Sequence, residues 1–292
     1  MIRTSERGRT CGRRHVVVTG ASSGIGRATA EGLTRRGYHV FAAMHDPADI
    51  PMDTTQLRFD VTDAKQIAAA VGVVERHVGA AGLDGLANVA GIGVSWPLEL
   101  IPLDELRRQF EVNVVGQLAV TQAFLPMLRA ARGRIVMIGS IGDRIAVPFA
   151  GPLAASKGAL ATVTEALRHE LAPWGIHVVL VEPASIHTEA VDKLECDSRR
   201  TVMRFSPAGR QLYGDTYLRM IKAMLTRERA GSPPHVVADT IATALHNRHP
   251  RARYLVGRDA RKLATLAQLL PTPGLDAVRR RLFQLPVPDS QL

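Results

Sequence analysis

The sequence has few of the residues that build disulfide-bonded, metal-binding or membrane-spanning proteins. Its 292 residues include two cysteines, Cys11 and Cys196, too few for a disulfide framework or a zinc site. Aromatic residues make up 4%, so leucine, isoleucine, valine and alanine must fill the core. No apolar run approaches the roughly 18 residues of a membrane span, and residues 1–14 contain no secretory signal. These absences favour a globular protein in a reducing, cytoplasmic setting.

Positive charge is spread unevenly along the chain, whose formal net charge is +10. Residues 1–14 carry five arginines and one glutamate, and residues 199–292 carry 17 basic and six acidic side chains, whereas the stretch between them is net acidic. A basic end of this kind fits either a solvated arginine-rich surface or weak contact with an anionic membrane. Because there is no zinc-finger spacing or aromatic-basic RNA motif, we expect no nucleic-acid partner.

Short β-branched runs alternate with stretches of helical composition over most of the chain. We expect strands at residues 15–19, 38–43, 57–59, 85–88, 134–139, 176–182 and 253–256. We expect the main helices at residues 27–36, 63–78, 103–131, 152–173 and 235–247. Strands separated by helices predict an α/β fold, a Rossmann-type doubly wound parallel sheet with helices on both faces.

We predict one dinucleotide-binding and catalytic domain over residues 15–258. A disordered basic tail at 1–14 precedes it, and a helical extension at 259–292 follows it. Residues 184–234 show no clear period, and we expect a mobile lid insertion there. The extension carries two leucine stripes at helical spacing, which either pack on the domain or cap the substrate entrance at a membrane surface.

A glycine-rich turn follows the first expected strand, with the sequence Thr19-Gly20-Ala21-Ser22-Ser23-Gly24-Ile25-Gly26. Such a turn lets the backbone approach a pyrophosphate at the N-terminus of the next helix. Other polar or small residues follow at strand ends and helix faces, namely Asp60-Val61-Thr62-Asp63, Asn88-Val89-Ala90-Gly91, Asn113, Ser140 and Lys157. Together, over residues 15–188, these features resemble the short-chain dehydrogenase/reductase family, including its TGxxxGxG and NxAG motifs.

The resemblance implies an oxidoreductase that uses NAD or NADP and assembles as a homo-oligomer. By the resemblance, the residues that contact the cofactor are Gly20, Ser22, Ser23, Gly24, Ile25, Gly26, His45, Asp60, Val61, Asn88, Ala90, Gly91, Lys157, Pro183 and Thr188. Residues 253–257 and the leucine- and arginine-rich helices after them look like the branch that acts on retinoids, steroids and similar alcohols. That second resemblance implies a lipophilic small-molecule substrate.

The choice between NAD and NADP is expected at the end of the second strand. By the resemblance, an NAD enzyme carries an acidic residue for the ribose hydroxyl where this chain has Met44. His45 follows, where NADP enzymes often have arginine, and imidazole is a weaker, pH-dependent phosphate partner. Ser22 and Ser23 could also donate to a 2′-phosphate. We therefore expect NADP, with NAD as the alternative and His45 then a plain surface residue.

The catalytic residues depart from the family pattern. The family's Tyr-x-x-x-Lys pair places a tyrosine four residues before the position of Lys157, and this sequence has Leu153 there. By the resemblance, Ser140 binds the substrate oxygen, Asn113 holds a water, and Lys157 also binds the nicotinamide ribose. Leucine cannot exchange the substrate proton, and losing such an acid/base typically lowers the rate by about 10²–10⁴.

Two functions therefore stay open. A water, His187, Tyr213 or Tyr217 could replace the phenol, and the protein would then be an oxidoreductase for a lipophilic alcohol or ketone. Otherwise the protein binds the dinucleotide with little turnover, as a sensor or a partner subunit. Ala184, where the family usually has glycine, narrows the backbone choices near the nicotinamide and adds to this doubt. Because most of the site is retained, the enzyme is the favoured interpretation.

Overall fold

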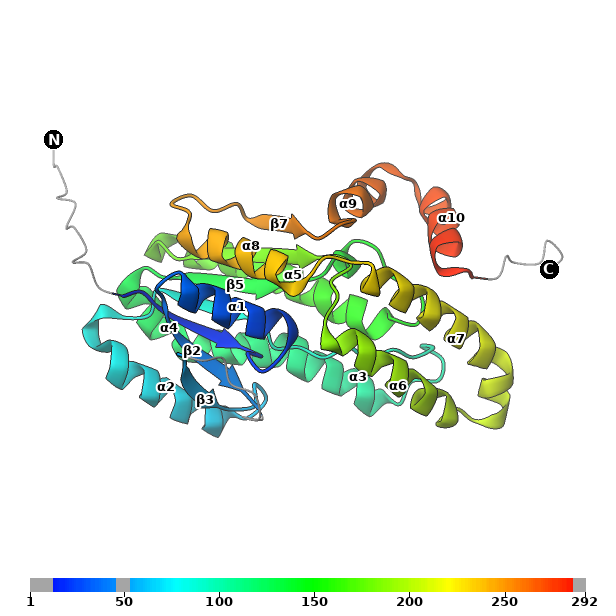
Figure 1. Ribbon diagram of the computed structural model, residues 1–292, viewed down its shortest axis with the longest axis horizontal. Coiled ribbons are helices and arrows are strands. Elements are labelled where there is room, and N and C mark those ends of the chain that lie inside the picture. The colour runs from blue at the N-terminus through cyan, green and yellow to red at the C-terminus, as the bar shows by residue number, and fades with distance from the viewer. Residues whose placement is uncertain (1–12, 46–52, 286–292) are drawn as a thin grey trace.

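The computed structural model describes residues 13–45 and 53–285, which form an α/β domain around one parallel sheet (Figure 1). Its strands lie in the order β3-β2-β1-β4-β5-β6-β7. They are β1 (His15–Thr19), β2 (His39–Met44), β3 (Thr55–Arg58), β4 (Gly85–Asn88), β5 (Arg134–Ile138), β6 (His177–Pro183) and β7 (Arg253–Val256). The order reverses between β1 and β4, and doubly wound sheets bind ligands at the crevice that such a reversal creates.

Helices cover the sheet on both faces. They are α1 (Gly24–Arg35), α2 (Ala64–Val78), α3 (Leu103–Phe110), α4 (Gln117–Ala131), α5 (Gly151–Leu171), α6 (Glu189–Met203), α7 (Pro207–Arg229), α8 (Pro234–His246), α9 (Ala260–Leu269) and α10 (Thr272–Phe283). Val16 and Val18 of β1 pack with α1 and α8, whereas Val17 packs with α2, α4 and α5. This alternation follows from the pleat, and burial on both faces explains why β1 is a continuous apolar run.

The predicted doubly wound parallel sheet is confirmed, and each expected strand is present within two residues of its expected bounds. The helix expected at 103–131 is divided, because a π-helical turn at Glu111–Gly116 separates α3 from α4. Of the basic tail predicted at 1–14, residues 1–12 lie outside the described part of the chain.

The sequence predicts a mobile insertion at 184–234, and the structure instead contains the helices α6 and α7 there. The buried stripe of α7 includes Tyr217, Ile221 and Leu225, which recur every four residues. Polar residues surround this stripe on every turn and hide its period in the sequence. Movement of this region as a lid stays a prediction.

The helical stretch Leu103–Ala131 is long and apolar enough to pass for a membrane span by length and composition. From the sequence we predict no membrane span. In the fold, however, Val120, Phe124 and Leu128 of α4 are fully buried in the core beside the sheet. This stretch is therefore a core element of the domain.

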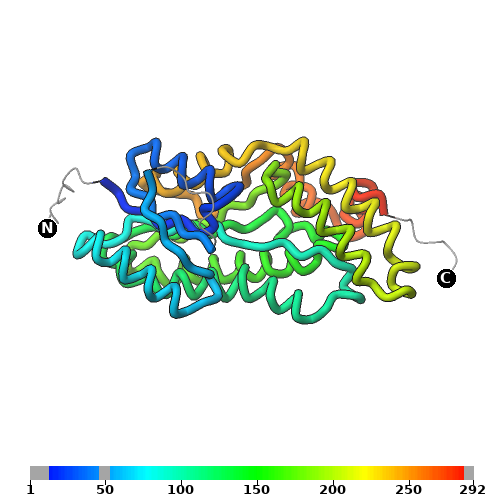
Figure 2. Tube along the Cα trace, turned by 60° about the horizontal axis from the view of Figure 1, so that its bottom comes forward, coloured from blue at the N-terminus to red at the C-terminus, as the bar shows by residue number. Residues whose placement is uncertain are grey.

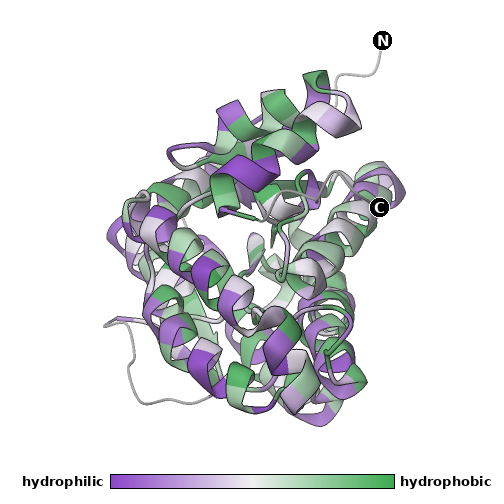
Figure 3. Ribbon diagram, turned by 90° about the vertical axis from the view of Figure 1, so that its right-hand side faces the viewer, coloured by the Kyte–Doolittle hydropathy of each residue, from purple (hydrophilic) through white to green (hydrophobic). Residues whose placement is uncertain are grey.

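A second assembly of helices lies beyond the sheet. Figure 1 shows α6, α7, α9 and α10 gathered at the right-hand end of the molecule, and the turned view of Figure 2 shows the same grouping. A third hydrophobic cluster joins α6, α7 and α10, and includes Trp96, Phe205, Tyr217, Met220 and Phe283. Seen from this end, the helices carry hydrophilic and hydrophobic residues interspersed along their length (Figure 3). This end of the molecule is thus built from helices that lie beyond the sheet.

Candidate active site

The glycine-rich turn after β1 has a backbone that only glycine accommodates. Gly20 has φ +66°, and a Cβ there would lie 2.8 Å from the Cα of Ala90. A Cβ on Gly26 would overlap the carbonyl oxygen of Gly20. The turn therefore folds tightly onto the end of β4 and presents the N-terminus of α1 to the crevice, where free N–H groups and the helix dipole favour an anion.

Two buried polar residues fix the neighbouring strand ends. The hydroxyl of Thr19 accepts from the backbone N–H groups of Val89 and Ala90, at 2.9 and 3.0 Å. The side-chain nitrogen of Asn88 donates to Thr121 at 2.8 Å, while its buried Oδ1 has no hydrogen-bond partner among the described residues. The free Asn88 Oδ1 can accept a hydrogen bond from a hydroxyl group, and the glycine-rich turn can admit a phosphate. Both groups occur in a dinucleotide, and both features lie at the point where the strand order of the sheet reverses.

The start of α6 lies against the glycine-rich turn. Thr188 precedes α6, and its Cβ would lie 3.3 Å from a Cβ on Gly24. The carboxylate of Glu189 accepts a hydrogen bond of 2.9 Å from the Gly24 N–H. A carboxylate of the protein therefore occupies one donor of the anion-binding turn. The sequence analysis missed Glu189, whose only signal was its position directly after Thr188.

At the other end of the crevice, the structure brings together His45 and Asp60, as the sequence predicts for the adenosine end. Oδ1 of Asp60 accepts from the N–H and the hydroxyl of Thr62 at 2.8 Å each, and its Oδ2 lies 3.7 Å from Nε2 of the exposed His45. Burial raises the pKa of Asp60, but the two Thr62 hydrogen bonds and the charges of His45 and Arg108 outweigh it and leave the pKa lowered. The neighbouring Val61 is buried.

Lys157, Asn113 and Gly91 converge at the middle of the crevice. A Cβ on Gly91 would lie 3.2 Å from Oδ1 of Asn113 and 3.8 Å from Nζ of Lys157. Nζ donates to the carbonyl oxygen of Ile138 at 2.6 Å, and burial lowers the pKa of Lys157 to about 8. Asn113 lies on the π-helical turn, and its amide bonds both the N–H and the carbonyl of Ile92 at 2.9 Å. Asn113 therefore holds the backbone that follows Gly91.

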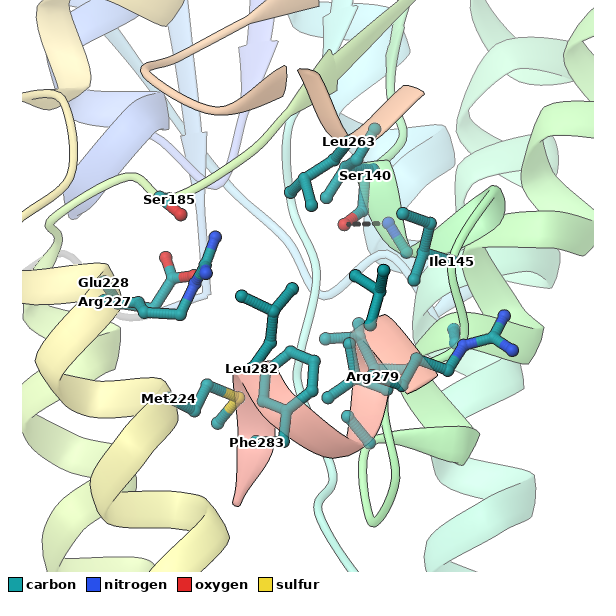
Figure 4. Close-up of a pocket in the computed structure, with 17 residues that line it drawn as sticks. Ser140, Ile145, Ser185, Met224, Arg227, Glu228, Leu263, Arg279, Leu282 and Phe283 are labelled. Carbon is teal, nitrogen blue, oxygen red and sulfur yellow. Dashed lines mark hydrogen bonds between the residues drawn. The ribbon is translucent and has the colours of Figure 1, made fainter. Parts of the chain in front are cut away.

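Next to this point lies a largely apolar pocket that contains Ser140 and Leu153. Residues from α7, α9 and α10 complete its wall, including Met224, Leu263 and Phe283. The hydroxyl of Ser140 accepts from the Gly142 N–H at 3.0 Å, the dashed contact in Figure 4. This leaves its proton free to be donated to a ligand in the pocket. The leucine stripes of α9 and α10 also face this pocket in part, since Leu263, Val278 and Leu282 line it.

The three alternative proton donors named from the sequence do not line this pocket. The hydroxyl of the fully buried Tyr217 donates to the carbonyl of Ser95 at 3.0 Å, and that of Tyr213 donates to Glu99. His187 has an exposed side chain, and its backbone N–H donates to Ser232. His187 is next to Thr188 in the sequence, and the two tyrosines lie on a helix that contributes to the pocket, but none of the three side chains enters it.

An ionic cluster that the sequence analysis missed lies under the Ser140 loop. Glu182 is fully buried at the end of β6 and binds Arg144 at 2.7 and 3.1 Å. Arg253 of β7 binds Asp143 at 3.1 Å. Burial, with the charge and hydrogen bond of Glu182, raises the pKa of Asp143 to about 7. Pro183 and Ala184 follow Glu182 directly. Ala184 is buried, and its backbone N–H donates to the carbonyl oxygen of Val256 at 2.9 Å.

Comparison with known proteins agrees with this geometry. The sequence profile of the short chain dehydrogenase family matches residues 14–198. The chain is 33% identical over 277 residues to the NADPH-dependent 3-dehydrocapnine reductase of Ornithobacterium rhinotracheale, covering 91% of this chain and 95% of that protein. It is 35% identical over 281 residues to retinol dehydrogenase 5 of Mus musculus, covering 90% and 86%.

A solved structure is similar over nearly the whole chain. The short chain dehydrogenase from Burkholderia cenocepacia J2315, in complex with NADP, has a TM-score of 0.69 at 26% identity, covering 94% of this chain and 99% of that chain. The protein therefore belongs to the short-chain dehydrogenase family of oxidoreductases, whose members bind NAD or NADP. Within the described residues, no group of three or more histidine, cysteine, aspartate or glutamate side chains is placed to hold a metal ion.

Proposed function

We propose that the protein is an NAD(P)(H)-dependent oxidoreductase that interconverts a lipophilic alcohol and the corresponding ketone or aldehyde. The observation that carries this proposal is the largely apolar pocket that both Ser140 and Leu153 line. A pocket with few polar groups suits an apolar substrate and fixes its orientation through those groups. The names of two relatives support an oxidoreductase of this type, since one is a retinol dehydrogenase and the other a reductase.

For the cofactor we propose NADP. The NADPH-dependent relative and the NADP complex of the solved structure support this choice. His45 and the hydroxyls of Ser22 and Ser23 are the groups that would contact a 2′-phosphate. The N–H groups after Gly24 would bind the pyrophosphate, and Lys157 and Thr188 would orient the nicotinamide end.

The roles of the chain's own residues follow from their contacts. The bound dinucleotide supplies or accepts the hydride. Ser140 donates a hydrogen bond to the substrate oxygen, because its hydroxyl proton has no acceptor among the described residues while its oxygen accepts from the Gly142 N–H. Charge that develops on this oxygen is stabilised most strongly in a pocket from which apolar side chains exclude water. Leu153 adds to this apolar wall but cannot carry the proton. The proposed proton carrier is a single water held at Ser140, in a pocket from which bulk water is excluded.

A second function is favoured by Leu153 itself. If no group in the pocket exchanges the proton efficiently, the protein binds the dinucleotide and turns over little, as a sensor or a partner subunit. Oxidation of NADPH in the presence of a panel of lipophilic ketones separates the two functions. Turnover that disappears in Ser140→Ala supports the enzyme. A rise in melting temperature with NADPH but no turnover supports the sensor, and no rise with either cofactor contradicts both.

A further inference from the structure

Three charged side chains line the pocket, and one of them lacks a counter-ion. Arg227 binds Asp259 at 2.8 Å, and Arg279 binds Asp276 at 2.7 Å. Each arginine is therefore neutralised by an aspartate of the chain. Glu228 also lines the pocket, and it makes no salt bridge with any residue in the described part of the chain. Of the three charged side chains in the pocket wall, Glu228 is thus the one that makes no ion pair, although the charge of Arg227 acts on it.

Glu228 lies in the last turn of α7 and reaches the loop after β6. Its Oε2 accepts the N–H of Ile186 at 3.0 Å, and its other oxygen makes no hydrogen bond with the described residues. Figure 4 shows Glu228 and Ser185 on one side of the pocket and Ser140 on the other, with Leu282 between them. A ligand that fills the pocket would meet a polar group at each end and apolar side chains along its length.

The surroundings of Glu228 make an ionised carboxylate unfavourable when the pocket holds no cation. Burial raises its pKa to about 7, against the Ile186 hydrogen bond and the charge of Arg227, and Asp259 raises it further. The other charges near this wall are Arg279 of α10 and Arg258, whose guanidinium binds the Ala230 carbonyl at 3.2 Å. A partly desolvated carboxylate without an ion-pair partner is energetically unfavourable. A cationic ligand would supply the missing partner and would therefore bind favourably at Glu228.

We propose that Glu228 binds an amino group of the substrate, so that the lipophilic alcohol or ketone carries a protonated amine remote from its reacting carbon. The ammonium donates to the free oxygen of Glu228, and the hydroxyl of Ser185 lies beside it in the pocket wall. The apolar chain of the substrate packs against Leu282 and its neighbours, with the reacting oxygen at Ser140. The reaction assigned to this substrate rests on the proposed function, whereas binding of the amine does not.

Binding of two matched probes, octylamine and octan-1-ol, tests the carboxylate directly by calorimetry on the full chain. At pH 8 we expect octylamine to bind at least about 10-fold more tightly than the alcohol, which is about 1.4 kcal/mol. Glu228→Gln keeps an acceptor for the Ile186 N–H but removes the charge, so the preference should disappear while the melting temperature stays close to that of the wild type. Glu195→Gln, an exposed carboxylate that binds Arg229 on the outer side of α6, is the matched control and should keep it.

The pH dependence supplies a signature that a merely structural role lacks. An alkylamine has a pKa near that of lysine, about 10.4, and stays charged between pH 6 and 8.5. Glu228 loses its charge as the pH falls through about 7. The preference for octylamine should therefore decrease from pH 8.5 to pH 6 in the wild type and in Glu195→Gln. A preference that persists in Glu228→Gln, or the absence of any preference in the wild type at pH 8, overturns the proposal.

Turnover of amino alcohols then connects the site to the reaction. The probes are 2-alkanols with a terminal amine on chains of four to ten carbons, each compared with the plain 2-alkanol of equal length and NADP. We expect at least one chain length to show a kcat/KM about 10-fold above its plain partner, and Glu228→Gln to remove that advantage through KM. Equal kcat/KM values for all pairs overturn the substrate assignment. If no alcohol is oxidised although octylamine binds through Glu228, the proposed oxidoreductase function fails and the amine site stands.

Discussion

The dinucleotide crevice and the apolar pocket adjoin each other at one edge of the sheet, yet they are built in different ways. The crevice is shaped by backbone: Gly20 with its positive φ, the close approach of Gly26, and N–H groups at the start of α1. The pocket is shaped by side chains that lie far apart in sequence, from Ser140 to Phe283. A site shaped by the backbone depends on short sequence motifs and tolerates few substitutions. A pocket shaped by side chains can acquire a different chemistry through a single substitution. Leu153 and Glu228 both belong to the side-chain pocket.

The largest expected effect tests whether the pocket has lost only its proton carrier. Leu153 lines the pocket in the first turn of α5, one turn before Lys157, so Leu153→Tyr would place a phenol near Ser140 with its pKa lowered by the lysine. We expect ketone reduction with NADPH to rise by about 10²–10⁴. Leu153→Phe is the matched control, with similar bulk and no hydroxyl. If Leu153→Tyr is folded, binds NADPH and is no faster than Leu153→Phe, the missing phenol is not what limits the reaction.

The next effect tests the backbone character of the crevice. Gly24 has φ +49°, and a side chain there would meet Thr188 and fill space that the pyrophosphate needs. Gly24→Val should weaken NADPH binding by at least about 100-fold. At a ligand concentration of 100 times the wild-type Kd, this removes at least about 2.3 of the roughly 2.7 kcal/mol by which NADPH stabilises the protein. Calorimetry and thermal shift measure this. Gly72→Ala on α2, where the nearest atom to a Cβ is Arg76 Nη1 at 3.5 Å, should bind NADPH normally. Equal binding by both variants contradicts the assigned role of the turn.

This difference also explains what could be predicted from the sequence. The sheet, the glycine-rich turn and the position of Gly91 follow from short patterns that lie at strand ends, and parallel strands bring those ends to one edge. Asn113 and Lys157 lie on helices, and their convergence with Gly91 was expected from the resemblance to the family. Such short patterns indicate where a site lies, because the residues that form it are neighbours in the sequence. The strands β1, β2, β5 and β6 were predictable from their apolar runs between helices.

The rest could not be predicted, because it depends on contacts between distant residues. Nothing near Glu228 in the sequence indicates that α7 will bring it to Ile186, and Glu182 and Asp143 meet Arg253 across two strands. The helices α6 and α7 were missed because a single narrow stripe on α7 is buried among polar residues. Proton donors proposed by proximity, such as Tyr217, proved to belong to a separate hydrophobic cluster.

A smaller effect is expected where the two regions touch. Glu189 at the start of α6 holds the Gly24 N–H, so a pyrophosphate must compete with this carboxylate. Glu189→Gln removes the negative charge, and we expect affinity for NADPH and for ADP-ribose to increase by about 10-fold, or about 1.4 kcal/mol. Adenosine, which has no pyrophosphate, should bind equally to both proteins. Unchanged or weaker NADPH binding in Glu189→Gln, measured beside Glu195→Gln, would show that the carboxylate does not compete with the cofactor.

The smallest expected effect concerns the ionic cluster that supports the Ser140 loop from below. Because the pKa of Asp143 is raised from 3.8 to about 7 in the folded protein, the folded state keeps a proton there that the unfolded chain has already released between pH 4 and 7. The stabilising contribution of this proton is full below pH 4 and is lost as the pH rises towards 7. Asparagine does not titrate, so the melting temperature of Asp143→Asn relative to the wild type should increase by a few degrees from pH 5 to pH 7.5. Asp104→Asn, at the exposed start of α3, corrects for the loss of one negative charge. Parallel melting curves for Asp143→Asn and the wild type across this range would show that Asp143 is already ionised in the fold, and the Ser140 loop would then rest on a fully charged cluster.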